Sequence, residues 1–227
     1  MENKERLITI AGGLKEILAQ VVFVGGSVLE LYLENETVCD IRQTDDIDVV
    51  ATTITYKQYA ELEERLRQLG FQHDMSEDAP ICRKVYQGIK VDFMPTDENA
   101  LGFSNQWYKA GVDKATNYSL TENVKIRIFP IAYFIASKIS AFLSPSRKYQ
   151  GDFMASHDFE DIMTILAYKE GIIEEIQQAD IEVRIYLQQF LSTLKQRDDF
   201  HYILQCLLYN EELEQKTETL INKILSL

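Results

Sequence analysis

The chain has 227 residues, with 23 Lys and Arg against 36 Asp and Glu, a formal net charge of −13 at pH 7. An acidic surface is poorly suited to general nucleic-acid binding, because a protein that binds nucleic acid must neutralise phosphates. It leaves room for a local basic groove, and it suits a cationic small molecule or a basic partner. The three cysteines form no Cys-x-x-Cys pair and leave an odd count, which argues against a disulfide framework and a zinc site.

The sequence also predicts neither a membrane span nor a signal peptide. No apolar stretch approaches the length of a membrane span. The first twenty residues contain glycines and charges where a signal peptide needs an unbroken apolar core. We therefore expect a soluble, cytoplasmic protein without a membrane partner.

The N-terminal elements lead to a glycine-rich turn. Residues 3–19 have the apolar spacing of an amphipathic helix, and residues 21–24 (Val-Val-Phe-Val) predict a short buried strand. Gly25-Gly26-Ser27 ends that run, and a helical pattern follows. A glycine pair between strand and helix lets the backbone turn sharply and approach a ligand. The amides at the start of such a helix suit a phosphate.

Two aspartates mark the next predicted strand. In Asp46-Ile47-Asp48-Val49-Val50, alternate side chains share a face, so Asp46 and Asp48 project together while Ile47 and Val49 face the core. Neighbouring carboxylates repel each other unless a cation lies between them. A hard divalent ion with oxygen ligands, Mg²⁺ by preference, is the usual solution.

A helix over 56–69, a short strand over 71–75 and a hairpin follow. Residues 81–87 and 89–94 form the strands of the hairpin, joined at Gly88. Asp92 interrupts the apolar run of its second strand and shares a face with Lys90. It is either a third carboxylate of the site or an edge-strand aspartate facing water.

The second half of the chain changes from strands to helices at Pro130. Residues 95–113 are predicted to be irregular, with Trp107 and Tyr108 as either stacking surfaces for a base or buried anchors. Two strands come next, and then helices. The predicted strands cover 115–120 and 124–129, and the predicted helices cover 131–143, 157–168, 172–178, 181–196 and 200–227 with a break near Asn210.

Two of these helices carry candidate binding residues. Lys138 falls at the centre of an apolar stripe, where it must either extend to solvent or be matched by an anion. Asp158 lies beside the apolar stripe of its helix, and Asp161 is expected further out. Alternatively, Ser156 caps this helix and the acids simply favour its positive end. Arg147 and Lys148 form a local basic cluster in the preceding loop.

The order strand, Gly-Gly-Ser, helix, then Asp-x-Asp on the next strand resembles the nucleotidyltransferases of the DNA polymerase β superfamily. Within it, Arg42-x-Thr44-x-Asp46-Ile47-Asp48 is most similar to the branch that contains AbiEii-type toxins of abortive-infection and toxin–antitoxin systems. Eighteen residues separate Ser27 from Asp46, more than is usual in the family, so residues 35–43 are interpreted as an insertion.

This resemblance implies an α+β fold, with a mixed-sheet nucleotidyltransferase domain over 1–129 and a helical domain over 130–227 that completes the nucleotide cleft. It implies that Gly25, Gly26 and Ser27 hold phosphates. Lys138, in a Lys-x-x-Ala context, would contact the triphosphate, and Asp158 would also bind nucleotide, with His157 where the family usually has lysine. The metal ligands would be Asp46, Asp48 and Asp92, with Asp92 also taking the proton of the acceptor.

The expected activity is Mg²⁺-dependent transfer of a nucleoside monophosphate from a nucleoside triphosphate to an acceptor hydroxyl. The resemblance favours a toxin-like enzyme acting on RNA (tRNA) or protein and neutralised by an antitoxin. The acidic surface favours a small cationic acceptor, as in aminoglycoside nucleotidyltransferases. An inactive nucleotidyltransferase fold that serves as a binding module is the third alternative.

Overall fold

The structure is a computed structural model, and it describes residues 2–33, 42–53 and 55–227. It divides into two compact units, described separately below. The first unit contains Met1–Leu31 and Ile41–Pro130, and the second contains Tyr32–Asp40 and Ile131–Leu227. The assignment of functional domains to 1–129 and 130–227 stays a prediction. Most of the predicted insertion over 35–43 lies outside the described residues.

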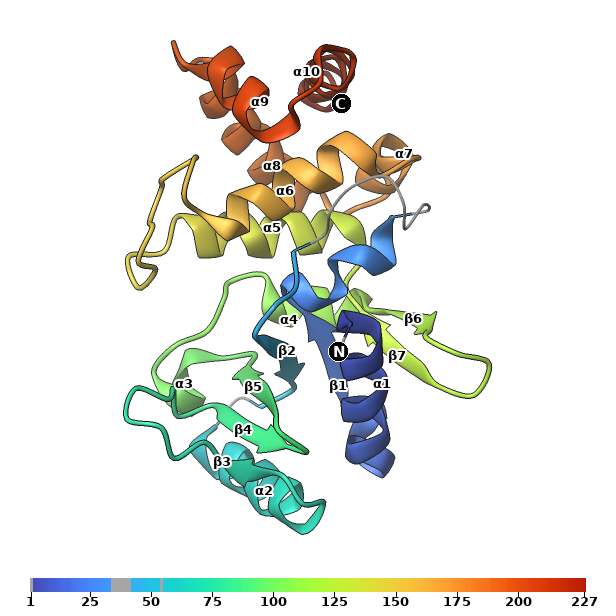
Figure 1. Ribbon diagram of the computed structural model, residues 1–227, viewed down its shortest axis with the longest axis vertical. Helices are drawn as coiled ribbons and strands as arrows, with labels where there is room; N and C mark the ends of the chain where they lie inside the picture. The colour runs from blue at the N-terminus through green and yellow to red at the C-terminus, as the bar shows by residue number, and fades with distance from the viewer. Residues whose placement is uncertain (1, 34–41, 54) are drawn as a thin grey trace. The chain divides into compact units, whose positions relative to one another are not determined.

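The first unit is built on a mixed seven-stranded sheet with the strand order β3-β4-β5-β2-β1-β7-β6 (Figure 1). Its strands are β1 (Val21–Val24), β2 (Asp46–Ala51), β3 (Gln72–His73), β4 (Arg83–Tyr86), β5 (Ile89–Pro95), β6 (Thr116–Ser119) and β7 (Lys125–Ile128). The pairs β1–β7 and β2–β5 are parallel, and the other pairs are antiparallel. A sheet followed by helices confirms the predicted α+β class.

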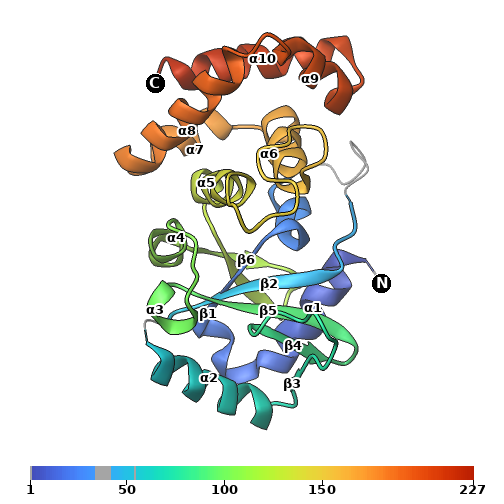
Figure 2. The same cartoon turned by 90° about the vertical axis from the view of Figure 1, so that its left-hand side faces the viewer.

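Two helices, α1 (Asn3–Leu14) and α2 (Tyr56–Gln68), cover one face of this sheet. Lys84 and Tyr86 alternate on β4 and therefore share a face. Lys84 Nζ lies 2.6 Å from Glu63 of α2, and Gly13 of α1 packs directly against the ring of Tyr86. Figure 2 shows α2 beside β3 and β4 from a second direction. Ile47 and Val49 of β2 share this helix-covered face with their partners Val91 and Phe93 of β5, because directly paired residues point the same way.

The hairpin β4–β5 turns at Gln87 and Gly88, which have φ values of 49° and 80°. Positive φ at both central positions is typical of the two-residue turn that suits the twist of paired strands. This turn sets the register in which Arg83 pairs with Asp92.

Several short elements differ from the sequence-based expectation. The N-terminal helix ends at Leu14 and continues as a 3₁₀-helix, Lys15–Gln20, and the segment after the glycine turn is also a 3₁₀-helix, Gly26–Tyr32. The region 95–113 is not irregular, because it contains α3 (Glu98–Leu101) and α4 (Tyr108–Lys114). Helices of four and seven residues are stabilised by packing and carry little periodic pattern of their own.

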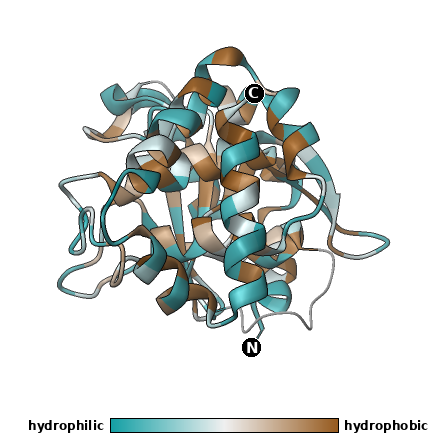
Figure 3. Cartoon of the chain, turned by 90° about the horizontal axis from the view of Figure 1, so that it is seen from above, coloured by the Kyte–Doolittle hydropathy of each residue, from teal (hydrophilic) through white to brown (hydrophobic). Residues whose placement is uncertain are grey.

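The second unit is helical in its described part. Its helices are α5 (Ile131–Phe142), α6 (His157–Tyr168), α7 (Ile172–Gln177), α8 (Ile181–Lys195), α9 (Phe200–Leu208) and α10 (Glu211–Leu225). The rings of Phe142, Phe159 and Phe190 are buried together in its core, and the half-buried Phe153 packs against Phe142 and Phe159, with ring centroids of the contacting pairs 4.8–6.3 Å apart. Figure 3 shows that helices of the chain carry both hydrophilic and hydrophobic residues. Within the described residues, no helix is long and apolar enough to cross a bilayer.

Candidate active site

Asp46, Asp48 and Asp92, the carboxylate cluster, project from two neighbouring strands. In the parallel pair β2–β5, Asp48 lies directly opposite Asp92, and Asp46 lies opposite Lys90. Since paired and alternate residues share a face, all three aspartates lie on the sheet face opposite α1 and α2. Strand β5 is flanked by β4 and β2, so the alternative of an edge-strand Asp92 facing water is wrong.

The glycine turn after β1 touches this cluster. Val24, the last residue of β1, pairs with Asp48, so the turn begins next to the Asp48 side chain. Gly25 has a φ of 74°, and a Cβ atom at this position would lie 2.0 Å from Oδ2 of Asp48. Only glycine combines the left-handed backbone with this approach. The structure thus brings Gly25 and the carboxylate cluster together.

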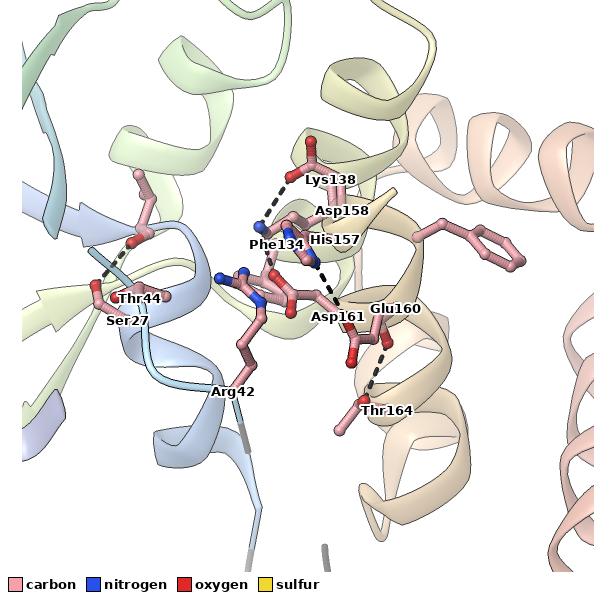
Figure 4. A network of polar contacts seen from close by, with 12 residues as sticks. Ser27, Arg42, Thr44, Phe134, Lys138, His157, Asp158, Glu160, Asp161 and Thr164 are labelled. Atoms are coloured by element: carbon pink, nitrogen blue, oxygen red, sulfur yellow. Dashed lines mark hydrogen bonds and ion pairs between the residues drawn. The ribbon is translucent and has the colours of Figure 1, made fainter. Parts of the chain in front are cut away.

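Gly26 and Ser27 follow Gly25 in this turn. Both residues are buried, and the Ser27 hydroxyl donates to the carbonyl of Val24 at 3.5 Å (Figure 4). A hydroxyl in this position is directed at the backbone of its own turn. The phosphate-binding role of Gly26 and Ser27 stays a prediction.

Arg83 is the cation that lies among these carboxylates. Its Nε donates to Oδ1 of Asp92 at 2.7 Å, and its Nη2 donates to Oδ2 of Asp92 at 2.8 Å and to Oδ2 of Asp46 at 2.5 Å. Hydrogen bonding to Asp92, together with the charges of both aspartates, raises the pKa of the Arg83 guanidinium. Sequence reasoning did not select Arg83, although a two-residue turn at Gln87 and Gly88 already pairs it with Asp92.

The first turns of α1 hold the chain just before β2. Arg6 donates to the carbonyls of Thr44 and Asp45, and Asn3 donates to the carbonyl of Arg42. The Thr44 hydroxyl in turn donates to the Asp46 carbonyl at 2.9 Å. These contacts fix the backbone that presents Asp46. The amphipathic pattern of the helix did not reveal this role, since it reports the buried stripe and not the polar residues.

In the second unit, Lys138 is matched by anions and does not extend to solvent. Its Nζ lies 2.9 Å from Oδ1 of Asp158 and 2.6 Å from Oδ2 of Asp161, and its side chain is 9% exposed (Figure 4). Burial lowers the pKa of this amine, but the Asp161 and Asp158 carboxylates raise it by more, so the pKa lies above its usual value. Lys138 and Asp158 therefore lie together as an ion pair, and their contact with a nucleotide stays a prediction.

Asp161 corrects one expectation and Ser156 confirms another. Asp161 was expected further out, but its side chain is 3% exposed and it completes the environment of Lys138. Residues three apart on a helix share a face, so Asp158 and Asp161 approach one ammonium. Ser156 caps α6 by accepting from the amide of Phe159, as predicted. His157 is exposed beside Glu160, and Arg147 Nε lies 3.4 Å from Asp158.

The carboxylate cluster suits a divalent ion in chemistry but not in its present arrangement. Carboxylate oxygens are the ligands that Mg²⁺ prefers. Among the described residues, however, no group of three or more His, Cys, Asp or Glu side chains is placed to hold a metal ion. Both oxygens of Asp92 and one of Asp46 accept from Arg83 instead. A metal would therefore need the guanidinium to withdraw.

Comparisons with known proteins find similarity in structure but not in sequence. No protein-family model matches the chain, and no curated protein matches its sequence. The chain is similar to an antigenic nucleotidyltransferase-like protein from Paracoccidioides brasiliensis, with 17% identity and a TM-score of 0.49 over 92% of this chain and 97% of that one. It is also similar to JHP933 from Helicobacter pylori, with 13% identity and a TM-score of 0.49 over 99% of this chain and 91% of that one. At this level of similarity, function has to be argued from the chain's own residues.

Proposed function

We propose that this protein is a Mg²⁺-dependent nucleotidyltransferase that transfers a nucleoside monophosphate to an acceptor hydroxyl. The observation that carries the proposal is the paired register of Asp48 and Asp92, with Asp46 on the same face. Three carboxylates from adjacent strands, with Gly25 packed against Asp48, form a compact acidic centre beside a sharp turn. The order of these residues along the chain also matches the polymerase β pattern.

In the proposed reaction, the acceptor oxygen attacks the α-phosphorus and forms a new P–O bond. The bond between the α-phosphorus and the bridging oxygen breaks, and pyrophosphate leaves with the electron pair. Asp92 accepts the proton of the hydroxyl. Gly25, Gly26 and Ser27 would hold the phosphates through the turn, while Lys138 and Asp158 would contribute to nucleotide binding. Mg²⁺, held by Asp46, Asp48 and Asp92, would supply positive charge against the triphosphate.

The acceptor we propose is RNA (tRNA) or protein, as for a toxin-like enzyme of the AbiEii type with an antitoxin partner. The order Arg42-x-Thr44-x-Asp46 supports this class. The hydroxyl of Thr44 bonds the Asp46 carbonyl, so this part of the motif has a structural role next to the cluster. The formal charge of −13 favours the alternative of a small cationic acceptor, such as an aminoglycoside.

A binding module without catalysis is the other candidate, and Arg83 is the observation that favours it. A guanidinium that permanently neutralised Asp46 and Asp92 would keep a metal ion away. This candidate predicts nucleotide binding without turnover.

The deciding experiment is incorporation of α-labelled nucleoside triphosphates in the presence of Mg²⁺. Total cell RNA, protein lysate and an aminoglycoside panel would serve as separate acceptor pools. Label is expected in one pool, and it should disappear with Asp46→Ala/Asp48→Ala. Asp45→Ala is the matched control, because its exposed side chain lies one position away from the cluster. Absence of label from all three pools, together with absence of triphosphate binding by calorimetry, would exclude the transferase.

A further inference from the structure

Arg83 has an unusual position for a residue of the proposed reaction. It starts β4, lies opposite Asp92 in the antiparallel pair β4–β5, and is therefore on the face of the carboxylate cluster. Its side chain is 18% exposed, against 9% for Asp92 and 32% for Asp46. The guanidinium is thus partly enclosed with the two groups that it neutralises.

The Arg83 guanidinium makes a bidentate contact with Asp92 and a further hydrogen bond to Asp46. Nε and Nη2 take one oxygen each of Asp92, at 2.7 and 2.8 Å, which is the planar bidentate geometry that arginine shares with carboxylates. Nη2 also reaches Asp46 at 2.5 Å, so one guanidinium links the two strands β2 and β5 through their side chains. Without this cation, Asp46 and Asp92 would repel each other.

A divalent ion that bound the same two carboxylates would be repelled by the Arg83 guanidinium. Each Asp92 oxygen accepts from Arg83, so a metal ligated there would lie within a few ångströms of a fixed positive charge. At such a separation and partial burial, repulsion between like charges is large enough to decide affinity. The same bidentate contact already occupies one acceptor position on each oxygen of Asp92.

We propose that Arg83 is the resident cation of the carboxylate cluster: it holds Asp46 and Asp92 in position and must release them when a divalent ion binds. Arg83 is then a positioning residue, and it sets the affinity of the site for metal. Release of Asp46 and Asp92 by the guanidinium and arrival of the metal then become one event. This inference rests on the proposed nucleotidyltransferase function.

The test is Mn²⁺ binding to the full chain, measured by the loss of the free-ion EPR signal. Arg83→Gln should bind Mn²⁺ at least about tenfold more tightly than the wild type, because a competing charge has been removed. Arg67→Gln is the matched control, since it removes the same charge from an exposed residue of α2 that pairs with Glu64. Its affinity should equal that of the wild type.

A second measurement avoids dependence on the folding of Arg83→Gln. In ¹⁵N-labelled wild type, the Nε–H resonance of Arg83 is expected to be protected by its bond to Asp92. Titration with diamagnetic Mg²⁺ should shift it or expose it to solvent exchange.

The outcomes separate the two proposals. Equal or weaker Mn²⁺ binding by folded Arg83→Gln, or an Arg83 resonance unmoved at saturating Mg²⁺, would overturn the role of Arg83 while leaving the transferase intact. Absence of Mn²⁺ binding by the wild type and by Arg83→Gln alike would overturn both.

Discussion

Gly25 lies so close to Asp48 that a Cβ atom on the glycine would be 2.0 Å from Oδ2 of the aspartate. Gly25→Ala must therefore displace the Asp48 carboxylate or distort the turn, and it also places alanine at a φ of 74°. We expect a loss of about 1–3 kcal/mol in the free energy of unfolding. Transferase activity should fall by about a hundredfold, because small displacements of reacting groups are costly.

Gly88→Ala provides the control for this substitution. Gly88 has a similar φ of 80°, but no atom lies within 4 Å of its Cβ position. It should lose stability through backbone strain alone and keep its activity per folded molecule. Chemical denaturation and labelled-nucleotide incorporation measure the two effects, and equal activity losses in both variants would contradict a specific contact with Asp48.

Lys138→Met tests whether the buried lysine is required for the fold. The substitution removes the ammonium from the buried Asp161 and the half-buried Asp158, and the unpaired Asp161 charge should make the loss about 3–5 kcal/mol of unfolding free energy. Lys148→Met, at an exposed lysine of the preceding loop, should change stability by less than about 0.5 kcal/mol. Urea unfolding measures both. If Lys138→Met keeps wild-type stability but loses triphosphate affinity, the lysine serves the nucleotide and not the fold.

Arg6→Ala should destabilise the backbone segment that leads into β2 without disturbing the hydrophobic core. Arg6 donates to the carbonyls of Thr44 and Asp45, two and one residues before Asp46. Loss of these bonds should cost about 1–3 kcal/mol of stability and lower transferase activity through misplacement of Asp46. Arg67→Ala on the surface of α2 is the comparison. Activity equal in the two variants would show that α1 does not position the cluster.

The Cys82 thiol gives the stability a defined pH dependence. Burial, with a contribution from Asp92, raises its pKa to about 12. In the unfolded chain the thiol titrates with a pKa of about 8.5. The folded state therefore holds the proton longer, so this contribution to stability is complete below that value and is lost as pH rises toward 12. The slope for one proton is at most about 1.4 kcal/mol per pH unit.

Urea unfolding of wild type and Cys82→Ala at pH 7.5 and pH 10 checks this prediction. The difference in unfolding free energy between the two proteins should shrink at the higher pH. Tyrosines titrate in both proteins and cancel in the comparison. A difference that is independent of pH would mean that the Cys82 thiol is accessible to solvent in the folded state.

Local patterns predicted most of the regular elements. The run Val21–Val24 is a strand in the structure because four consecutive apolar residues are buried together, and His157–Tyr168 is a helix because its apolar spacing and Ser156 cap agree. The short helices α3 and α4 were missed, because their stability comes from packing against neighbours. The depth of Asp161 was missed for a similar reason: burial depends on what packs against a helix.

By itself, the sequence determined the α+β class, the strand that carries Asp46 and Asp48, and the glycine turn that precedes it. These depend on alternation and on backbone freedom, which act over a few neighbouring residues. Only the tertiary structure decided which cation neutralises each group of acids. Arg83 reaches Asp46 from a strand 37 residues later, and Lys138 reaches Asp158 and Asp161 from another helix. Such pairs form where separate elements meet, and electrostatic energy depends on those distances and not on position along the chain.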